Sequence, residues 1–202
     1  LLPTFGGATL SLFFMAEFLV SDYFAGSGGA ADDATDCTAA VQAALNAAKA
    51  AHGGSVVFPR GICRVNSDVS VEFSGKEGHL RLCGSAGDSA IRITGSHFNA
   101  LYLAATDLIT LENFVVLGDL GRNYDACNSV IYLSHGRVNV RNMQFYGLGC
   151  NGATAGSGIL SLSSCVAEVS NTHFDGCMAP SSGVLNLLDS HGAIVRNTEF
   201  FD

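Results

Sequence analysis

Acidic, basic and histidine side chains recur in the second half of the sequence, where they could do acid–base chemistry. Two carboxyl groups about 5 to 10 Å apart can hydrolyse a glycosidic bond, whereas a cation beside a base can acidify a carbon and remove its proton. Arg141, Arg196 and His173 could supply such a cation and base. The candidate catalytic residues are therefore Glu168, His173, Glu199, Arg141 and Arg196, and the sequence does not decide which of them act.

Two charged pairs have a simpler interpretation. Glu112 and Arg141 fall in successive units of the repeat described below, and we expect them to form an ion pair across neighbouring coils on a solvated face. Asp32 and Asp33 precede a predicted helix, where acidic side chains favour a turn and the positive helix N-terminus. Neither pair is therefore interpreted as a hydrolytic acid and base.

An internal repeat places these residues. Four segments align, starting at residues 100, 130, 158 and 183, and each has an asparagine after a short alternating run. The asparagines are 29, 29 and 26 residues apart, and a period in this range indicates a solenoid. They are Asn113, Asn142, Asn171 and Asn197.

Each repeat contains two short runs of alternating apolar and polar residues, as in VIYL followed by VNVRN. Alternation of this kind predicts strands with one buried face. A helical solenoid would need longer runs with a period of about 3.6 residues, and leucine-rich repeats would place closely spaced leucines around the asparagine. The pattern therefore predicts an all-β fold, a parallel β-helix whose strands pair with those of the coils above and below.

The repeat also predicts which side chains stack. Apolar columns are expected inside the sheets, and asparagines at the bend between two sheets, where their amides can donate to one another. The predicted columns are Leu103, Leu133, Leu162 and Leu187; Leu111, Val140, Val169 and Val195; Phe145, Phe174 and Phe200; and the four asparagines. The asparagines are thus predicted to be structural.

One helix is predicted before the coils, at about residues 35–52. A β-helix exposes apolar interior and unpaired strand edges at its first turn, so an amphipathic helix is expected to cover that end. The N-cap and C-terminal glycines follow the usual preferences. The residues expected to build this cap are Thr35 or Asp36 at its start, Val41, Leu45 and Ala48 on its apolar stripe, and Gly53 and Gly54 at its end.

Residues 22–65 resemble the N-terminal signature of the pectate-lyase superfamily of single-stranded right-handed parallel β-helices, found in tailspikes and in epimerase-like and rhamnogalacturonase-like proteins. The resemblance lies in an Asp-aromatic start, the helix TDCTAAVQAA and the strand entry GGSVVFPRGICRV. It implies the fold, often with a polysaccharide ligand, and transfers no catalytic residue. The matching structural positions are Thr35, Asp36, Thr38, Gln42, Gly53, Gly54, Pro59 and Gly61, whereas Cys37 replaces a common second Asp.

Seven cysteines, none in a CxxC pair, favour disulfides in an oxidising compartment over a zinc site. Buried reduced thiols are the alternative. Cys150 and Cys177 follow the phenylalanines of consecutive repeats, and the coil spacing suits a disulfide between them. Neither a metal nor a cofactor is expected.

Residues 1–21 are predicted to form an apolar N-terminal arm and residues 22–202 the β-helix domain, with coils at about 55–202. The run LSLFFMAEFLV is shorter than the roughly 20 residues of a membrane span and contains Glu17, so no span is expected. A net charge of −8 argues against a nucleic-acid partner.

Two functions remain open. The first is a structural or adhesive unit of an extracellular, secreted or virion-surface assembly that contacts glycans, with self-association through the arm and the open β-helix end, because NTEFFD has no recognisable cap. The alternative is a polysaccharide lyase or glycoside hydrolase of the resembled superfamily.

Overall fold

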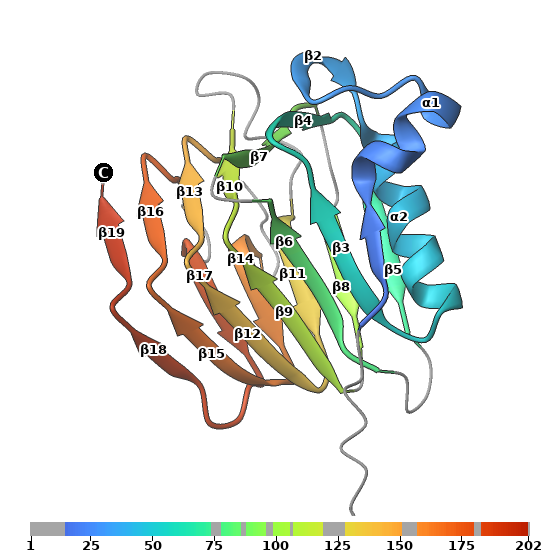
Figure 1. The fold of residues 1–202 in the computed structure, drawn as a ribbon. Helices are drawn as coiled ribbons and strands as arrows, with labels where there is room; N and C mark the ends of the chain where they lie inside the picture. The colour runs from blue at the N-terminus through green and yellow to red at the C-terminus, as the bar shows by residue number, and fades with distance from the viewer. Residues whose placement is uncertain are drawn as a thin grey trace, which may run out of the picture.

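The computed structural model describes residues 15–73, 78–85, 88–95, 99–105, 107–118, 128–150, 157–179 and 183–201. Within these ranges the strands pair in parallel and form three sheets, here called A, B and C (Figure 1). The chain passes through A, B and C in turn and repeats this circuit for about five turns. The predicted right-handed parallel β-helix is confirmed.

The strands are short and regularly spaced. Sheet A consists of β1 (Glu17–Leu19), β3 (Gly54–Phe58), β6 (Leu80–Gly84), β9 (Leu108–Glu112), β12 (Arg137–Arg141), β15 (Val166–Ser170) and β18 (Ile194–Arg196). Sheet B consists of β2 (Asp32–Asp36), β4 (Gly61–Val65), β7 (Ser89–Ile93), β10 (Val115–Leu117), β13 (Gln144–Tyr146), β16 (His173–Asp175) and β19 (Glu199–Phe201). Sheet C consists of β5 (Val69–Glu72), β8 (Asn99–Ala104), β11 (Ser129–Ser134), β14 (Gly158–Ser163) and β17 (Leu185–Leu188).

The predicted columns are present in the strand register. Leu133 pairs with Leu103 and Leu162 in sheet C, and Val140 pairs with Leu111 and Val169 in sheet A. The phenylalanines of sheet B also stack, with 4.6 Å between the ring centroids of Phe145 and Phe174. The remaining members, Leu187, Val195 and Phe200, continue these columns.

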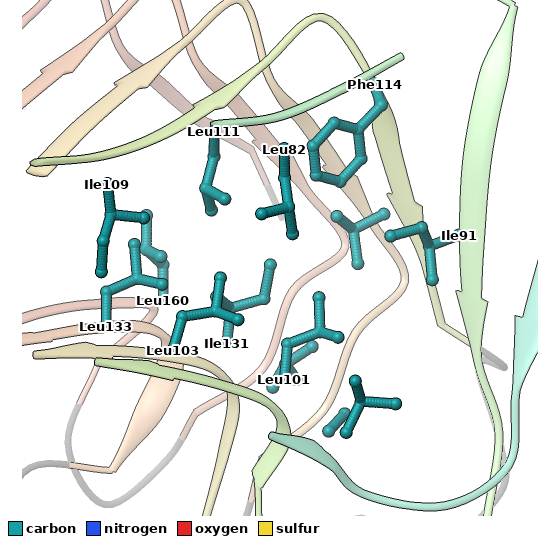
Figure 2. Packing of buried hydrophobic residues seen from close by; sticks show 14 of the residues in the cluster. Leu82, Ile91, Leu101, Leu103, Ile109, Leu111, Phe114, Ile131, Leu133 and Leu160 are labelled. Carbon is teal, nitrogen blue, oxygen red and sulfur yellow. The ribbon is translucent and has the colours of Figure 1, made fainter. Parts of the chain in front are cut away.

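The core lies between the three sheets. Figure 2 shows Ile109 and Leu111 of sheet A facing Leu103 and Leu133 of sheet C, and all four side chains are fully buried. Burying such side chains is the main favourable term in folding. In the last coil the same columns end in exposed side chains, with Leu187 38% and Phe200 53% exposed.

The asparagines form the expected ladder at the bend between sheets A and B. The side-chain amide of each later asparagine donates to the side-chain oxygen of the asparagine in the preceding coil. The distances are 3.1 Å from Asn142 to Asn113, 3.3 Å from Asn171 to Asn142, and 3.2 Å from Asn197 to Asn171. All four have positive φ, between 48° and 61°. Asparagine tolerates this left-handed conformation better than most residues, so the ladder and the bend have the same cause.

The bend before the ladder has a glycine instead. Gly84 takes the corresponding position, and a Cβ there would lie 2.3 Å from the carbonyl oxygen of Asn113. No side chain fits at this close approach. The ladder therefore begins in the coil of β9, after the coils of β3 and β6, where Phe58 and Gly84 take this position.

The N-terminal end is covered by η1 (Val20–Tyr23), α1 (Phe24–Ser27) and above all α2 (Thr38–Ala50), which lies beside β5 (Figure 1). The stripe Val41, Leu45 and Ala48 is fully buried, as predicted. The amide of Gln42 caps the edge of sheet C, because its Nε2 donates to Ser70 O over 2.8 Å and its Oε1 accepts from Ser70 N over 2.9 Å. A glutamine side chain thus replaces a neighbouring strand.

The two ends of α2 differ from expectation. Cys37 is the N-cap residue, although the Asp36 carboxylate accepts a hydrogen bond from Thr38 N over 2.9 Å. At the other end His52, with φ of 60°, takes the left-handed position, and Gly53 N donates to Ala48 O over 2.9 Å. This Schellman pattern satisfies the last carbonyls of the helix. Gly53 and Gly54 follow the end of the helix, but the left-handed position belongs to His52.

Gly53 and Gly54 serve close packing instead. A Cβ on Gly54 would lie 2.6 Å from the Phe18 ring, and one on Gly53 would lie 3.0 Å from the carbonyl oxygen of His79. Phe18 belongs to β1, which pairs with β3 and so adds part of the predicted N-terminal arm to sheet A. Residues 1–14 of that arm lie outside the described residues.

The cysteines of the described residues are free thiols, and the expected disulfide between Cys150 and Cys177 is not found. The two thiols instead donate to separate carbonyl groups, Cys150 to Asn128 over 2.9 Å and Cys177 to Phe145 over 3.5 Å. Cys127 lies outside the described residues. The helices that the structure describes are all too short or too polar to cross a bilayer.

Replacing Gln42 by Ala should leave the edge of β5 unpaired and lower the free energy of unfolding by about 1 to 2 kcal/mol. Hydrogen exchange at the Ser70 amide should accelerate, because Gln42 Oε1 is its acceptor. Asn46→Ala is the matched control, since Asn46 Oδ1 accepts a hydrogen bond from Gln42 Nε2 within α2. Equal effects of both substitutions on Ser70 exchange would contradict the edge-capping role.

Candidate functional site

Charged side chains gather on the outer face of sheet A, where the strands hold them in register. Two rows of outward-facing residues run across the strands, one through the middle of each strand and one at its end. The first row contains Glu17, Arg81, Thr110, Asn139 and Glu168. The second contains Cys83, Glu112, Arg141, Ser170 and Arg196.

Glu112 is the centre of this face. Its side chain is only 3% exposed, yet it carries a charge. Arg81 Nε donates to Glu112 Oε1 over 2.5 Å from the preceding coil, and Arg141 Nε donates to Glu112 Oε2 from the following coil. The predicted ion pair between Glu112 and Arg141 is confirmed, and Arg81 makes it a three-residue cluster.

Two opposing effects set the protonation of Glu112. Burial raises the pKa of this carboxyl, because it disfavours the charged form, but hydrogen bonds from Arg141 and Arg81 and their positive charges outweigh burial. The pKa of Glu112 is therefore lowered from its ordinary value. Glu112 stays ionised at neutral pH and cannot serve there as a general acid.

The two arginines have donors left over. Among the described residues, Arg81 and Arg141 each make a side-chain hydrogen bond only through Nε, and they are 32% and 54% exposed. The Nη groups of both guanidinium groups therefore remain available at the surface. A guanidinium fork binds carboxylate, sulfate or phosphate through parallel hydrogen bonds, so this arrangement suits an anionic ligand.

A histidine lies beside the cluster. His79 precedes β6, and its Nε2 lies 2.8 Å from Thr110 Oγ1, the neighbour of Arg81 in the sheet register. Burial lowers the pKa of His79, and the charge of Asp107 only partly opposes this. The imidazole is therefore neutral at neutral pH and able to accept a proton.

The predicted catalytic candidates fall on two different faces. Glu168 and Arg196 form an ion pair with each other on sheet A, one coil beyond Arg141. His173 Nδ1 lies 3.4 Å from Glu199 Oε2 on the outer face of sheet B, beside the rings of Tyr146 and Phe201. The structure thus joins the candidates into pairs and does not join the five into one site.

Sequence reasoning missed His79, Arg81 and Thr110. The repeat was recognised from its asparagines, and Gly84 replaces the asparagine in the coil that contains His79 and Arg81. The alternating run HLRLC at 79–83 was the signal that could have extended the repeat by one coil. Among the described residues no group of three or more His, Cys, Asp or Glu could hold a metal ion.

Comparison with known proteins reveals neither a matching family model nor a matching curated protein. Among solved structures, the chain is similar to the A-module of mannuronan C-5 epimerase AlgE4 from Azotobacter vinelandii, with a TM-score of 0.44 and 16% identity. It is also similar to ORF18 of Geobacillus virus E2, with a TM-score of 0.43 and 17% identity. The similar regions cover 92% and 91% of this chain but only 59% and 50% of those chains.

Replacing Glu112 by Gln should lower the free energy of unfolding at neutral pH by about 2 kcal/mol, because two arginines lose a buried anionic partner. The pKa of Glu112 is lower in the folded chain than its ordinary value of 4.5, so its contribution is present above that value and disappears as the pH falls further. Urea titrations near pH 7 and near pH 3 measure this difference.

Glu168→Gln is the matched control for that measurement. Glu168 is paired with Arg196 but is 37% exposed, and exposed ion pairs contribute less than about 1 kcal/mol. Two results would contradict the buried-carboxylate interpretation. One is a Glu112→Gln variant as stable as Glu168→Gln at neutral pH, and the other is a loss in free energy of unfolding for Glu112→Gln that grows as the pH falls.

Proposed function

We propose that this chain is a glycan-binding, non-catalytic β-helix unit of an extracellular or virion-surface assembly, and that the outer face of sheet A binds acidic polysaccharide. The observation that carries the proposal is the cluster of Arg81, Glu112 and Arg141. One buried carboxylate holds both guanidinium groups through Nε and leaves their Nη groups at the surface. Such forks match the carboxylate of a uronic acid or a sulfate ester.

The spacing of the arginines suits a polymer. Arg81 and Arg141 lie on β6 and β12, with β9 between them, so their strands are about 10 Å apart. They can therefore contact separate anionic groups along an extended chain that runs parallel to the β-helix axis. Preorganisation by Glu112 lowers the conformational entropy that each arginine would lose on binding.

The carboxyl groups argue for binding over hydrolysis. Glycoside hydrolysis uses one carboxyl that keeps its proton and a second that attacks or activates water. Glu112 is ionised between two arginines, and Glu168 is paired with Arg196. Glu112 therefore does not offer the protonated group that the reaction requires, and Glu168 is held in an ion pair.

A lyase remains the second candidate function, because of His79. In a lyase, an arginine neutralises the carboxylate of the sugar and a base removes the proton from the neighbouring carbon. The neutral imidazole of His79 could act as that base, with Arg81 as the arginine. This reaction differs from binding in one observable, since it leaves unsaturated sugar ends. The same experiment can therefore separate the two functions.

Self-association through the N-terminal arm and the open end of the β-helix stays a prediction. Residues 1–14 of the arm lie outside the described residues. In the last described coil, Val195 and Phe200 are 43% and 53% exposed, and further coils or a second subunit would cover this apolar surface.

Binding to polygalacturonate and alginate, with dextran as the neutral comparison, tests the proposal. We expect binding to the two acidic polymers only, weakening with salt. Arg141→Gln should reduce affinity about tenfold or more, the effect of losing one charge-assisted hydrogen bond. Arg141→Lys keeps the charge but loses the fork, so its affinity should lie between that of the unmodified chain and that of Arg141→Gln.

Arg60→Gln is the matched control, because Arg60 is 74% exposed and pairs with Asp88 outside the sheet-A strands. It removes the same charge and should leave affinity unchanged. Equal losses from Arg60→Gln and Arg141→Gln would reduce the effect to net charge and overturn the proposed site. Unsaturated products that disappear in His79→Gln would establish the lyase instead.

A further inference from the structure

Aromatic and acidic side chains gather on the outer face of sheet B, over the strands β13, β16 and β19. The middle residue of each of these strands is a phenylalanine of the stacked inner column. Because side chains alternate along a strand, the residues before and after it face outwards. One outward row consists of Gln144, His173 and Glu199, and the other of Tyr146, Asp175 and Phe201.

Three rings form one continuous surface across these coils. The centroid of the His173 imidazole lies 5.8 Å from that of the Tyr146 ring and 4.9 Å from that of the Phe201 ring. Tyr146 and Phe201 are two strands apart in their row, so His173 bridges the gap between them. Phe201 is 52% exposed. Such a surface can bury the apolar faces of successive sugar rings in a chain that runs along the β-helix axis.

Two carboxylates accompany the rings. Asp175 lies between Tyr146 and Phe201 in their row, with about 4.8 Å between neighbouring strands. Among the residues that the structure describes, Asp175 accepts hydrogen bonds through its backbone carbonyl, and its carboxylate has no partner. Glu199 is 67% exposed, and its Oε2 lies 3.4 Å from His173 Nδ1. Both carboxylates can therefore accept hydrogen bonds from a ligand.

The charge of this face selects the class of ligand. The strands β13, β16 and β19 contain no Lys or Arg, so an acidic polysaccharide is repelled here. A cation is attracted both by the carboxylates and by the negative faces of the aromatic rings. The acidic and histidine side chains of these described strands do not form a group that could hold a metal ion. An organic ammonium group fits the rings and the carboxylates together.

We propose that the outer face of β13, β16 and β19 binds a glycan of unacetylated amino sugars. The sugar rings pack against the three aromatic side chains, and the protonated amino groups pair with Asp175 and Glu199. This site does not rest on the proposed binding of acidic polysaccharide, because it lies on a different sheet and attracts the opposite charge. The net charge of −8 also draws a cationic polymer to the chain.

Titration calorimetry of the full chain with two oligosaccharides of equal length tests the proposal. One is a glucosamine oligomer, at a slightly acidic pH that protonates its amino groups. The other is the N-acetylglucosamine oligomer, which has the same sugar backbone without the charge. We expect the glucosamine oligomer to bind about tenfold more tightly or better, with an affinity that falls as salt is added. Equal affinity for the two oligomers, or no binding of the glucosamine oligomer, would overturn the proposal.

Variants locate the site on sheet B. Asp175→Asn should weaken binding of the glucosamine oligomer about tenfold, the effect of losing one charge-assisted hydrogen bond. Tyr146→Leu keeps an apolar side chain but removes a ring, and it should also weaken binding. Asp22→Asn is the matched control, because it removes the same charge from an exposed position in η1 at the capped end. A loss from Asp22→Asn as large as that from Asp175→Asn would contradict the site.

Arg141→Gln separates this site from the one proposed on sheet A. It should leave the affinity for the glucosamine oligomer unchanged, whether or not the chain binds acidic polymers. Loss of glucosamine-oligomer binding in Arg141→Gln would instead assign that binding to sheet A and overturn the inference.

Discussion

Parallel, in-register stacking is the constraint on which the rest of the structure depends. Each coil places a residue directly over its equivalent in the next coil, about 4.8 Å away. A position is therefore most stable where its side chain interacts favourably with the same position above and below. Leucine, phenylalanine and asparagine do so with copies of themselves, as the core columns and the ladder from Asn113 to Asn197 show. Like charges repel one another, and the cluster of Arg81, Glu112 and Arg141 accordingly brings opposite charges together between coils.

The same constraint makes the ends of the β-helix its weak points, because a terminal strand has no partner on one side. At the N-terminal end, side chains make the hydrogen bonds that the backbone of a neighbouring strand would otherwise make. Gln42 presents both a donor and an acceptor to Ser70, and the Thr38 hydroxyl accepts a hydrogen bond from Asn66 N over 2.9 Å. The cap is thus specified by polar atoms at fixed places as well as by its apolar stripe.

This difference explains how far sequence reasoning reached. The fold and the apolar columns were predictable, since the repeat fixes register and register fixes which residues stack. The charged cluster was only half predictable. Glu112 and Arg141 lie within the recognised repeat, whereas Arg81 and His79 lie in a coil whose bend has Gly84 in place of asparagine. At the end of α2, His52 takes a left-handed conformation usually taken by glycine, which composition alone does not reveal.

Stacking also bears on what chemistry the outer face can do. Two carboxyl groups in register on adjacent coils would repel each other and raise one pKa, which is one way to create a general acid. Sheet A does the opposite: the carboxyl of Glu112 has an arginine on each side, and its pKa is lowered. An ionised carboxylate held in this way is useful mainly for positioning its arginines. The face is therefore built to present cations rather than to donate protons, which is why we favour recognition of an anionic polymer over its hydrolysis.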